Sequence, residues 1–180
     1  VPSVTDFVLR AVALALTEHP RLNARWDDGK VVLFETVNMG VAVATDHGLV
    51  VPVIHHADRL SLHEITQIRT ELAAHAREGR LRSGDVADGT FTISNLGMFG
   101  VDRFLAILNP PQAAILAAGA IRDEVVPLNG QPAVQPVIDL TVTFDHRVVD
   151  GAVGARFLQT LVAIIEEPLR LVEQAPPLPH

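Results

Sequence analysis

A β-branched run that ends in a histidine motif constrains this chain more than any other feature. Residues 137–144 predict a strand, and the motif Asp145-His146-Arg147-Val148-Val149-Asp150-Gly151 follows directly. Asp150-Gly151 ends the strand pattern, and the apolar spacing beyond it predicts a helix over 152–167. The strand therefore delivers His146 at its end, where a neutral imidazole can take up a proton near pH 7. The His-x-x-x-Asp-Gly spacing is weak by itself, so its weight depends on the rest of the chain.

Composition indicates a globular chain and excludes several functions. The 180 residues suit one domain; 48% are hydrophobic and 19% charged, which suggests surface buried against other subunits. The net charge of −7 disfavours nucleic-acid binding. No uncharged apolar run of about 18 residues occurs, so we expect no membrane-spanning helix. The absence of cysteine excludes disulfides, thiolate metal sites and a cysteine nucleophile.

Helical and strand patterns alternate along the chain. Capping pairs predict two helices, one begun by Ser3 with Asp6 and one by Ser61 with Glu64. The run 113–121 is apolar on both faces and predicts a central strand. Further strands are predicted at 31–35, 41–45, 49–54 and 91–94, with a hairpin around Asp46-His47-Gly48 and a turn at Asn129-Gly130.

Ser94 is the second candidate for chemistry. It ends a predicted strand beside a loop containing Gly97 and Gly100, so its hydroxyl could face a cleft. Taken alone, a serine in such a place more often satisfies the backbone. Asn109-Pro110-Pro111-Gln112 predicts a rigid turn. The histidines lack metal-ligand spacing, so no metal site is expected, and the glycines match no nucleotide-phosphate loop.

Together these motifs resemble the dihydrolipoamide acyltransferases of 2-oxo acid dehydrogenase complexes. The resemblance is carried, in order, by the runs 48–53, 89–100, 109–112 and 145–152. It implies an α/β (α+β) sandwich with the mixed sheet and flanking helices of chloramphenicol acetyltransferase, assembled as homotrimers that build a larger core.

The resemblance also implies roles for single residues. His146 matches the general base, and Ser94 matches the hydroxyl that stabilises the tetrahedral oxyanion, with the two groups supplied by neighbouring subunits. Asp150 matches a residue that holds the loop in shape, usually through an ion pair. In the loop after Ser94, the candidates for contact with coenzyme A are Asn95, Gly97 and Met98.

The substrates that the resemblance implies are coenzyme A and a lipoyl group carried on a separate domain, with no metal. The run 94–100 together with the turn at 109–112 is most similar to acetyl-transferring members. The expected partners are the lipoyl domain and the 2-oxo acid decarboxylase and dihydrolipoamide dehydrogenase components, with no nucleic acid and no membrane. The expected location is the cytoplasm, or the mitochondrial matrix in a eukaryote.

One departure from the family and two alternatives stand beside this hypothesis. Family members carry a basic segment, a helix and a strand before the position of Ser3. We therefore expect 1–174 to be one catalytic domain without those N-terminal elements, and 175–180 to be a Pro-rich tail. Asp150 is then expected to lack its arginine partner, and the activity of this fragment is left open. The alternatives are an antibiotic O-acetyltransferase of the chloramphenicol type and a non-catalytic core component, although the presence of both His146 and Ser94 argues for chemistry.

Overall fold

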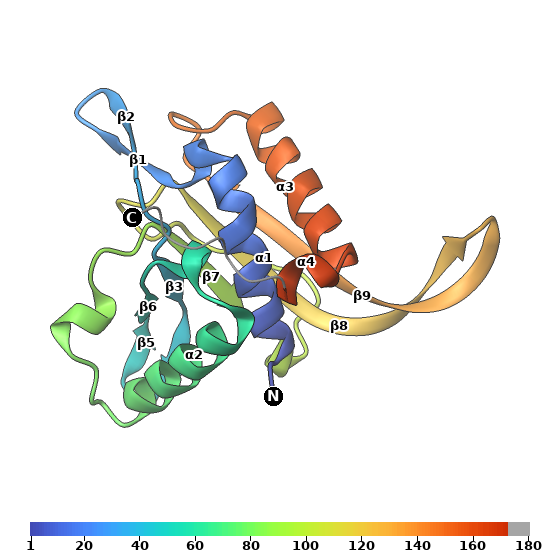
Figure 1. The fold of residues 1–180 in the computed structure, drawn as a ribbon, viewed down its shortest axis with the longest axis horizontal. Helices are drawn as coiled ribbons and strands as arrows, with labels where there is room; N and C mark the ends of the chain where they lie inside the picture. Colours follow the sequence, from blue (N-terminus) through green and yellow to red (C-terminus); the bar gives the residue numbers. More distant parts are fainter. Residues whose placement is uncertain (173–180) are drawn as a thin grey trace.

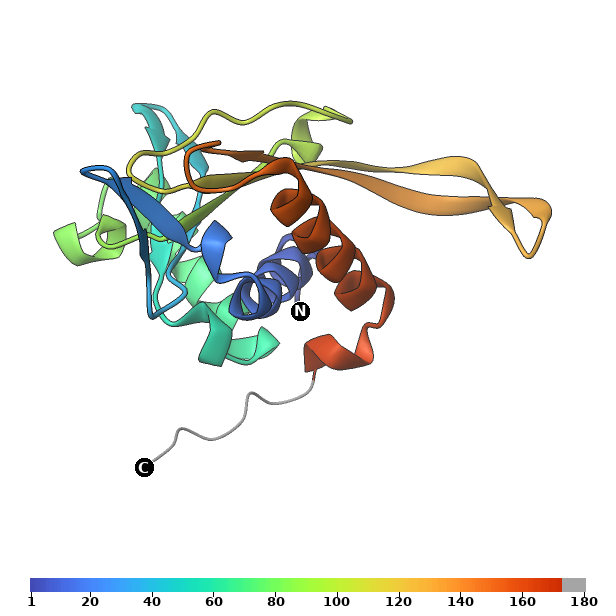
Figure 2. The ribbon, with the colours of Figure 1, turned by 90° about the horizontal axis from the view of Figure 1, so that it is seen from above.

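The computed structural model describes residues 1–172 as a mixed sheet with helices on one face (Figures 1 and 2). The α/β fold class is thus confirmed, and the predicted tail 175–180 lies outside the described residues. The helices are α1 (Val4–Glu18), α2 (Leu62–Arg77), α3 (Gly151–Glu166) and α4 (Leu169–Val172), with short 3-10 turns at Pro20–Leu22, Ala57–Arg59, Ser83–Val86 and Gly97–Phe99. The strands are β1 (Ala24–Asp27), β2 (Lys30–Leu33), β3 (Met39–Val41), β4 (Val43–Thr45), β5 (Gly48–Val50), β6 (Val53–Ile54), β7 (Phe91–Asn95), β8 (Ala114–Leu128) and β9 (Gln131–Phe144).

The main sheet has the strand order β6-β3-β7-β8-β9. The three central strands β3, β7 and β8 are parallel, and the outer strands β6 and β9 are antiparallel to their neighbours. Two small hairpins, β1–β2 and β4–β5, flank this sheet. Within residues 1–172, no helix combines the length and the apolar character needed to cross a bilayer.

Both predicted capping pairs are confirmed. The carboxylate of Asp6 accepts hydrogen bonds from the backbone N–H and the hydroxyl of Ser3, each over 2.7 Å. Ser61 and Glu64 exchange the same type of bonds at the start of α2. Helix α1 is buried over most of its surface because it lies between the sheet and the helices α2 and α3 (Figure 2).

The predicted hairpin forms only around its turn. Thr45 pairs with Gly48 and Val43 with Val50, but β3 joins β7 and β6 in the main sheet. The predicted run 41–45 is therefore divided at Ala42, whose N–H donates to Ile93 of β7. The prediction missed β1, because its sequence Ala-Arg-Trp-Asp shows neither alternation nor β-branching.

The predicted central strand β8 is confirmed, and it is longer than expected. Its first residues are buried between β7 and β9, but beyond Ala120 it leaves the body of the molecule together with β9. Figures 1 and 2 show this pair as a long ribbon that projects from one end. The predicted turn at its tip is confirmed, with φ of 51° at Asn129 and 78° at Gly130.

An extended segment, 101–109, crosses the sheet face opposite the helices (Figure 2). The N–H of Ala120 donates to the carbonyl of Val101 over 2.8 Å, which attaches the segment to β8. A Cβ at Gly119 would overlap the carbonyl oxygen of Asp102, so this close approach requires glycine. The segment exposes Leu105 and Ile107 at 79% and 90%.

Candidate active site

Ser94 lies near the end of β7, where two cavities adjoin. We call the first, of about 270 Å³, the α2 cavity; it is lined by Ser94, Arg69, Arg77, Leu96 and Met98 among others. The second, of about 410 Å³, is the loop cavity, lined by Ser94, Val51, Phe104, Ile107 and Asn109 among others. Ala42 and Leu49 also line both cavities. The half-buried Ser94 is therefore accessible from two directions.

Contacts around Ser94 distinguish it from its polar neighbours. The hydroxyl of Thr92 donates to the side-chain oxygen of Gln112 over 2.6 Å, and the side chain of Asn95 bonds to Thr5. No hydrogen bond to the Ser94 hydroxyl occurs within the part of the chain that the structure describes. Its hydroxyl is thus free to meet a substrate, whereas a purely structural serine would bond to nearby backbone.

The loop after Ser94 is fixed from two sides. The side-chain oxygen of Asn95 accepts from the N–H of Gly97 over 2.8 Å, while its amide donates to the Thr5 hydroxyl over 2.9 Å. A Cβ at Gly97 would lie 2.8 Å from the carbonyl oxygen of Gly119. Of the three residues predicted to contact coenzyme A, Asn95 and Met98 line the α2 cavity, while Gly97 is a packing residue behind it.

The loop that carries His146 is held by its neighbours. The carbonyl of Asp145 accepts from the N–H groups of Val148 and Val149, both of which are buried. The guanidinium of Arg147 binds the carboxylate of Asp145 and lies 5.3 Å from the ring centroid of Trp26 on β1. The His146 residue itself is exposed, with its ring centroid 6.2 Å from that of Phe144, so the imidazole is accessible from outside this chain.

Asp150 begins α3 as its N-cap. Its carboxylate accepts from the N–H of Val153 over 2.9 Å, and this bond is the main reason that the pKa of Asp150 lies below its usual value. Within residues 1–172, none of the ion pairs involves Asp150. Asp150 therefore shapes the loop through a helix cap.

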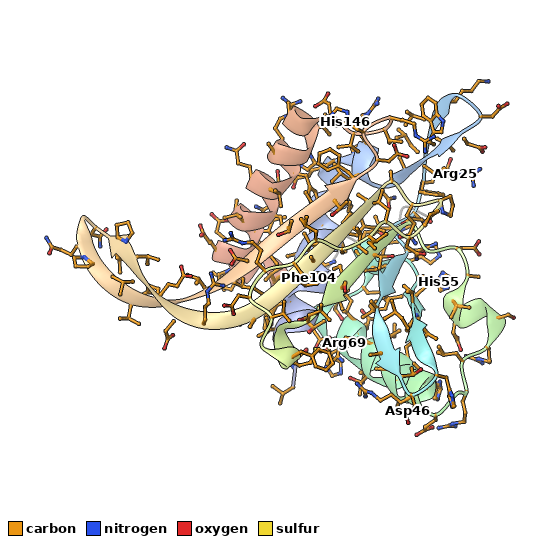
Figure 3. All side chains as sticks on the ribbon, turned by 180° about the vertical axis from the view of Figure 1, so that it is seen from behind. Arg25, Asp46, His55, Arg69, Phe104 and His146 are labelled. Atoms are coloured by element: carbon orange, nitrogen blue, oxygen red, sulfur yellow. The ribbon has the colours of Figure 1, made fainter. Side chains whose placement is uncertain are left out.

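The fold keeps His146 and Ser94 apart. Ser94 pairs with Ala117 of β8, and Ala117 pairs with Thr141 of β9, so β9 lies two strands from Ser94 at that level. His146 comes five residues further along, which gives a backbone separation of roughly 15–20 Å at standard sheet spacings. His146 lines neither cavity, and Figure 3 shows it well away from Phe104 and Arg69. One chain alone cannot place both groups on one substrate bond.

The two cavities differ in charge. The α2 cavity is lined by Arg69 and Arg77, whereas no charged residue lines the loop cavity. Arg69 binds the buried carboxylate of Asp6, with Nη2 to Oδ2 at 3.2 Å. Burial by itself raises the pKa of Asp6, but the hydrogen bonds from Arg69 and Ser3 outweigh burial and hold that pKa below its usual value.

Sequence reasoning did not find the buried polar contacts beneath the site. Thr92 binds Gln112, and Thr90 donates to the side-chain oxygen of Asn23 over 2.6 Å. The predicted turn at Asn109–Gln112 thus ends in a side chain that anchors β7. In the sequence, the pair Pro110-Pro111 was the only sign that this turn has a structural role. No group of three or more histidine or carboxylate side chains suited to a metal ion occurs within residues 1–172.

Comparisons with known proteins agree on one family. The family described as 2-oxoacid dehydrogenases acyltransferase (catalytic domain) matches residues 2–173. The acetyltransferase component of the acetoin cleaving system of Bacillus subtilis is 45% identical over 170 residues, which are 94% of this chain and 43% of that protein. This chain thus spans less than half the length of that relative.

Solved structures show the same relationship. A probable dihydrolipoamide acetyltransferase from Listeria monocytogenes aligns with a TM-score of 0.90 and 38% identity, over 92% of this chain and 70% of that one. The Azotobacter vinelandii dihydrolipoamide acetyltransferase aligns with a TM-score of 0.88 and 32% identity, over 95% of this chain and 71% of that one. Chloramphenicol acetyltransferase aligns with a TM-score of 0.56 and 21% identity, over 91% of this chain and 78% of that one. This likeness shows a shared fold alone.

Proposed function

This chain belongs to the catalytic-domain family of the 2-oxoacid dehydrogenase acyltransferases, and on that basis we propose that it transfers an acetyl group between a dihydrolipoyl thiol and coenzyme A. The acetyl group is supported by the relatives, which are named as acetyltransferases. The antibiotic acetyltransferase alternative has weaker support, because that likeness is limited to the fold.

The spacing of three residues along the chain supports the roles proposed for Ser94, His146 and Asp150. The work on the Azotobacter vinelandii enzyme concerned the catalytic role of one serine, one histidine 52 positions later and one asparagine four positions after that. In this chain His146 follows Ser94 by 52 positions, and Asp150 follows His146 by four. This equal spacing supports the proposed roles of Ser94 and His146, with Asp150 standing where that enzyme has the asparagine.

The proposed chemistry needs only a base and a hydrogen-bond donor. The neutral imidazole of His146 removes the proton of the coenzyme A thiol while its sulfur attacks the carbonyl carbon of the acetyl-dihydrolipoyl thioester. The carbonyl oxygen becomes an oxyanion that accepts a hydrogen bond from Ser94. Collapse of this intermediate breaks the bond to the lipoyl sulfur, which takes the proton back from the imidazolium. Atoms and charge balance without a metal or a covalent acyl-enzyme.

The proposed site is shared between two copies of the chain. Ser94 and His146 lie too far apart in one chain, and His146 points to space outside it. The apolar groups exposed around Ser94, namely Leu49, Met98, Phe99, Leu105 and Ile107, provide surface for a second copy to cover. We therefore propose a trimer as the smallest active unit, with assembly into a larger core that works with a lipoyl domain, a 2-oxo acid decarboxylase and a dihydrolipoamide dehydrogenase. As its location we propose the cytoplasm, or the mitochondrial matrix in a eukaryote.

An exchange assay tests the function directly. The full-length protein is expected to form acetyl-dihydrolipoamide from acetyl-coenzyme A and dihydrolipoamide, and to leave chloramphenicol unmodified. Acetylation of chloramphenicol would favour the antibiotic acetyltransferase. Assembly without either activity would favour the non-catalytic core component.

A further inference from the structure

The end of β7, which carries Ser94, is held by a paired strand on one side and by a side-chain contact to α1. We propose that Thr5, in the first turn of α1, is a positioning residue for the reaction: through Asn95 it fixes the direction of the Ser94 hydroxyl. In this role Thr5 acts through its neighbour and makes no contact with the reacting atoms. This inference rests on the acyl-transfer function proposed above.

The sheet supports the end of β7 on one side alone. Pairing with β3 extends only as far as Ile93, whose carbonyl accepts from the N–H of Ala42 over 2.9 Å. Pairing with β8 continues for two more residues, to Asn95. Ser94 therefore has a paired strand on the β8 side, while the other side adjoins Ala42, which lines both cavities. An open side gives a substrate access to the hydroxyl, but it leaves the strand end free to rotate unless another contact holds it.

Asn95 supplies that contact. Its amide donates to the hydroxyl of Thr5 over 2.9 Å, and its side-chain oxygen accepts from the N–H of Gly97 over 2.8 Å. Both ends of one amide are thus engaged, one with α1 and one with the loop that follows β7. Successive side chains of a strand point to opposite faces, so a rotation that displaced the Ser94 hydroxyl would also break the bond between Asn95 and Thr5.

Thr5 lies in a well-fixed part of the molecule. It precedes Asp6, whose carboxylate binds Ser3 at the start of the helix and Arg69 on α2. Helix α1 is itself buried between the sheet and its neighbouring helices (Figure 2). The half-buried Thr5 also lines the α2 cavity, beside the loop that it holds. The first turn of α1 is therefore a fixed anchor point for Asn95.

The direction of the serine hydroxyl matters because stabilisation of an oxyanion depends on geometry. A donor that is already in place loses little freedom when the oxyanion forms, whereas a mobile donor must first be ordered. The Ser94 hydroxyl has no hydrogen bond within the part of the chain that the structure describes, so side-chain contacts of its own do not orient it. The backbone must do so, and Asn95 is the adjoining residue through which α1 acts on that backbone.

Removal of the Thr5 hydroxyl in the full-length protein tests this role. Thr5→Val keeps the shape of the side chain and is expected to lower kcat by about 3- to 10-fold, the equivalent of one hydrogen bond, with the KM for either thiol substrate nearly unchanged. Thr5→Ser, which keeps the hydroxyl, should restore most of kcat. Thr17→Val is the matched control, because the exposed Thr17 hydroxyl on the same helix donates to the carbonyl of Leu14, and this change should leave kcat unaltered.

Double variants show whether Thr5 acts through the proposed residues. In an Asn95→Ala protein, and likewise in a Ser94→Ala protein, Thr5→Val should lower kcat no further, because the path from Thr5 to the oxyanion is already broken. A full additional loss in either background would overturn the proposal. So would a rise in KM with kcat preserved, or a fall in kcat that Thr17→Val reproduces.

A measurement that needs no turnover separates this inference from the proposed function. Amide hydrogen exchange in the peptide spanning 95–100, followed by mass spectrometry, should become faster in Thr5→Val and stay the same in Thr17→Val. If the unmodified protein transfers no acetyl group, the proposed function fails. Hydrogen exchange then still decides whether Thr5 fixes the loop after Ser94: faster exchange supports this contact, and unchanged exchange refutes it.

Discussion

Arg147 donates to the carboxylate of Asp145 over 2.7 Å, and the residue between them is His146. Two guanidinium nitrogens of Arg147, Nε and Nη2, and its backbone N–H take part, and these bonds hold the pKa of Asp145 below its usual value. The ion pair closes a small loop whose apex is the imidazole. A base that must meet a substrate held by another subunit benefits from such fixation, because little freedom is lost when the reaction occurs.

Removal of the imidazole should abolish acetyl transfer while trimers still form. His146→Ala is expected to lower kcat by at least the general-base factor of roughly 10²–10⁴, because no other described group in this loop can take the thiol proton. Steady-state rates and light scattering on the full-length protein measure both properties. His63→Ala, which changes an exposed histidine on α2, serves as control. Nearly unchanged turnover by a folded His146→Ala protein would remove the assignment.

Loss of the Ser94 hydroxyl should act on the transition state alone. Ser94→Ala is expected to lower kcat by roughly 10²–10³ with the KM for coenzyme A nearly unchanged, because the oxyanion exists only near the transition state. Initial rates measured at several concentrations of coenzyme A give kcat and KM separately. A large rise in KM with kcat preserved would instead make Ser94 a binding residue.

Two inactive variants should complement each other. In mixed trimers of His146→Ala and Ser94→Ala chains, at least one interface pairs an intact serine with an intact histidine. Co-refolded or co-expressed full-length chains should therefore regain activity, measured after native mass spectrometry has verified the mixture. Verified mixed trimers without activity would show that the site is not shared.

The Asp6–Arg69 pair should make stability depend on pH. The folded-state pKa of Asp6 is lowered, so its contribution is complete above the unfolded value near 3.9 and is lost as the pH falls through the lower folded value. Asp6→Asn should cost about 3–5 kcal/mol at pH 7, and less at pH 3. Urea denaturation at both pH values measures this, with the exposed Asp123→Asn as control. An equal cost at both pH values would contradict the role of the charge.

Gly119→Ala should displace the segment that covers the loop cavity. Its Cβ would overlap the carbonyl of Asp102, and backbone on both sides restricts relief. We expect destabilisation of about 1–3 kcal/mol and a lower rate of acetyl transfer, because the segment lines a cavity beside Ser94. Gly84→Ala, where a Cβ meets no atom within 4 Å, provides the comparison in thermal unfolding and kinetics. Unchanged values for Gly119→Ala would show that the segment moves freely.

Local signals explain what the sequence could predict. The caps at Ser3 and Ser61 and the turn at Asn129-Gly130 depend on neighbouring residues, and all three were correct. The strand before the histidine loop ends at Phe144 as predicted, but it begins at Gln131, six residues before the predicted start at Val137.

Long-range placement explains what the sequence could not predict. The attachment of segment 101–109 to β8, the pairing of Asp6 with Arg69 and the buried bond between Thr92 and Gln112 join residues far apart in the chain. No periodicity records such contacts. The two cavities beside Ser94 arise from these contacts, which is why their difference in charge became visible only in the fold.

The projecting β8–β9 ribbon exposes strand edges that could recruit further strands from other molecules. Its prolines oppose this. Pro127 faces Pro132, and Pro136 faces Asp123 four residues along the same ladder. A pair of prolines can exchange no ladder bonds, so their nitrogens point outward, where a free N–H would otherwise attract a new strand. The prolines thus reduce the capacity of the ribbon edges to pair with strands of other molecules, while the two faces of the ribbon keep their side chains exposed.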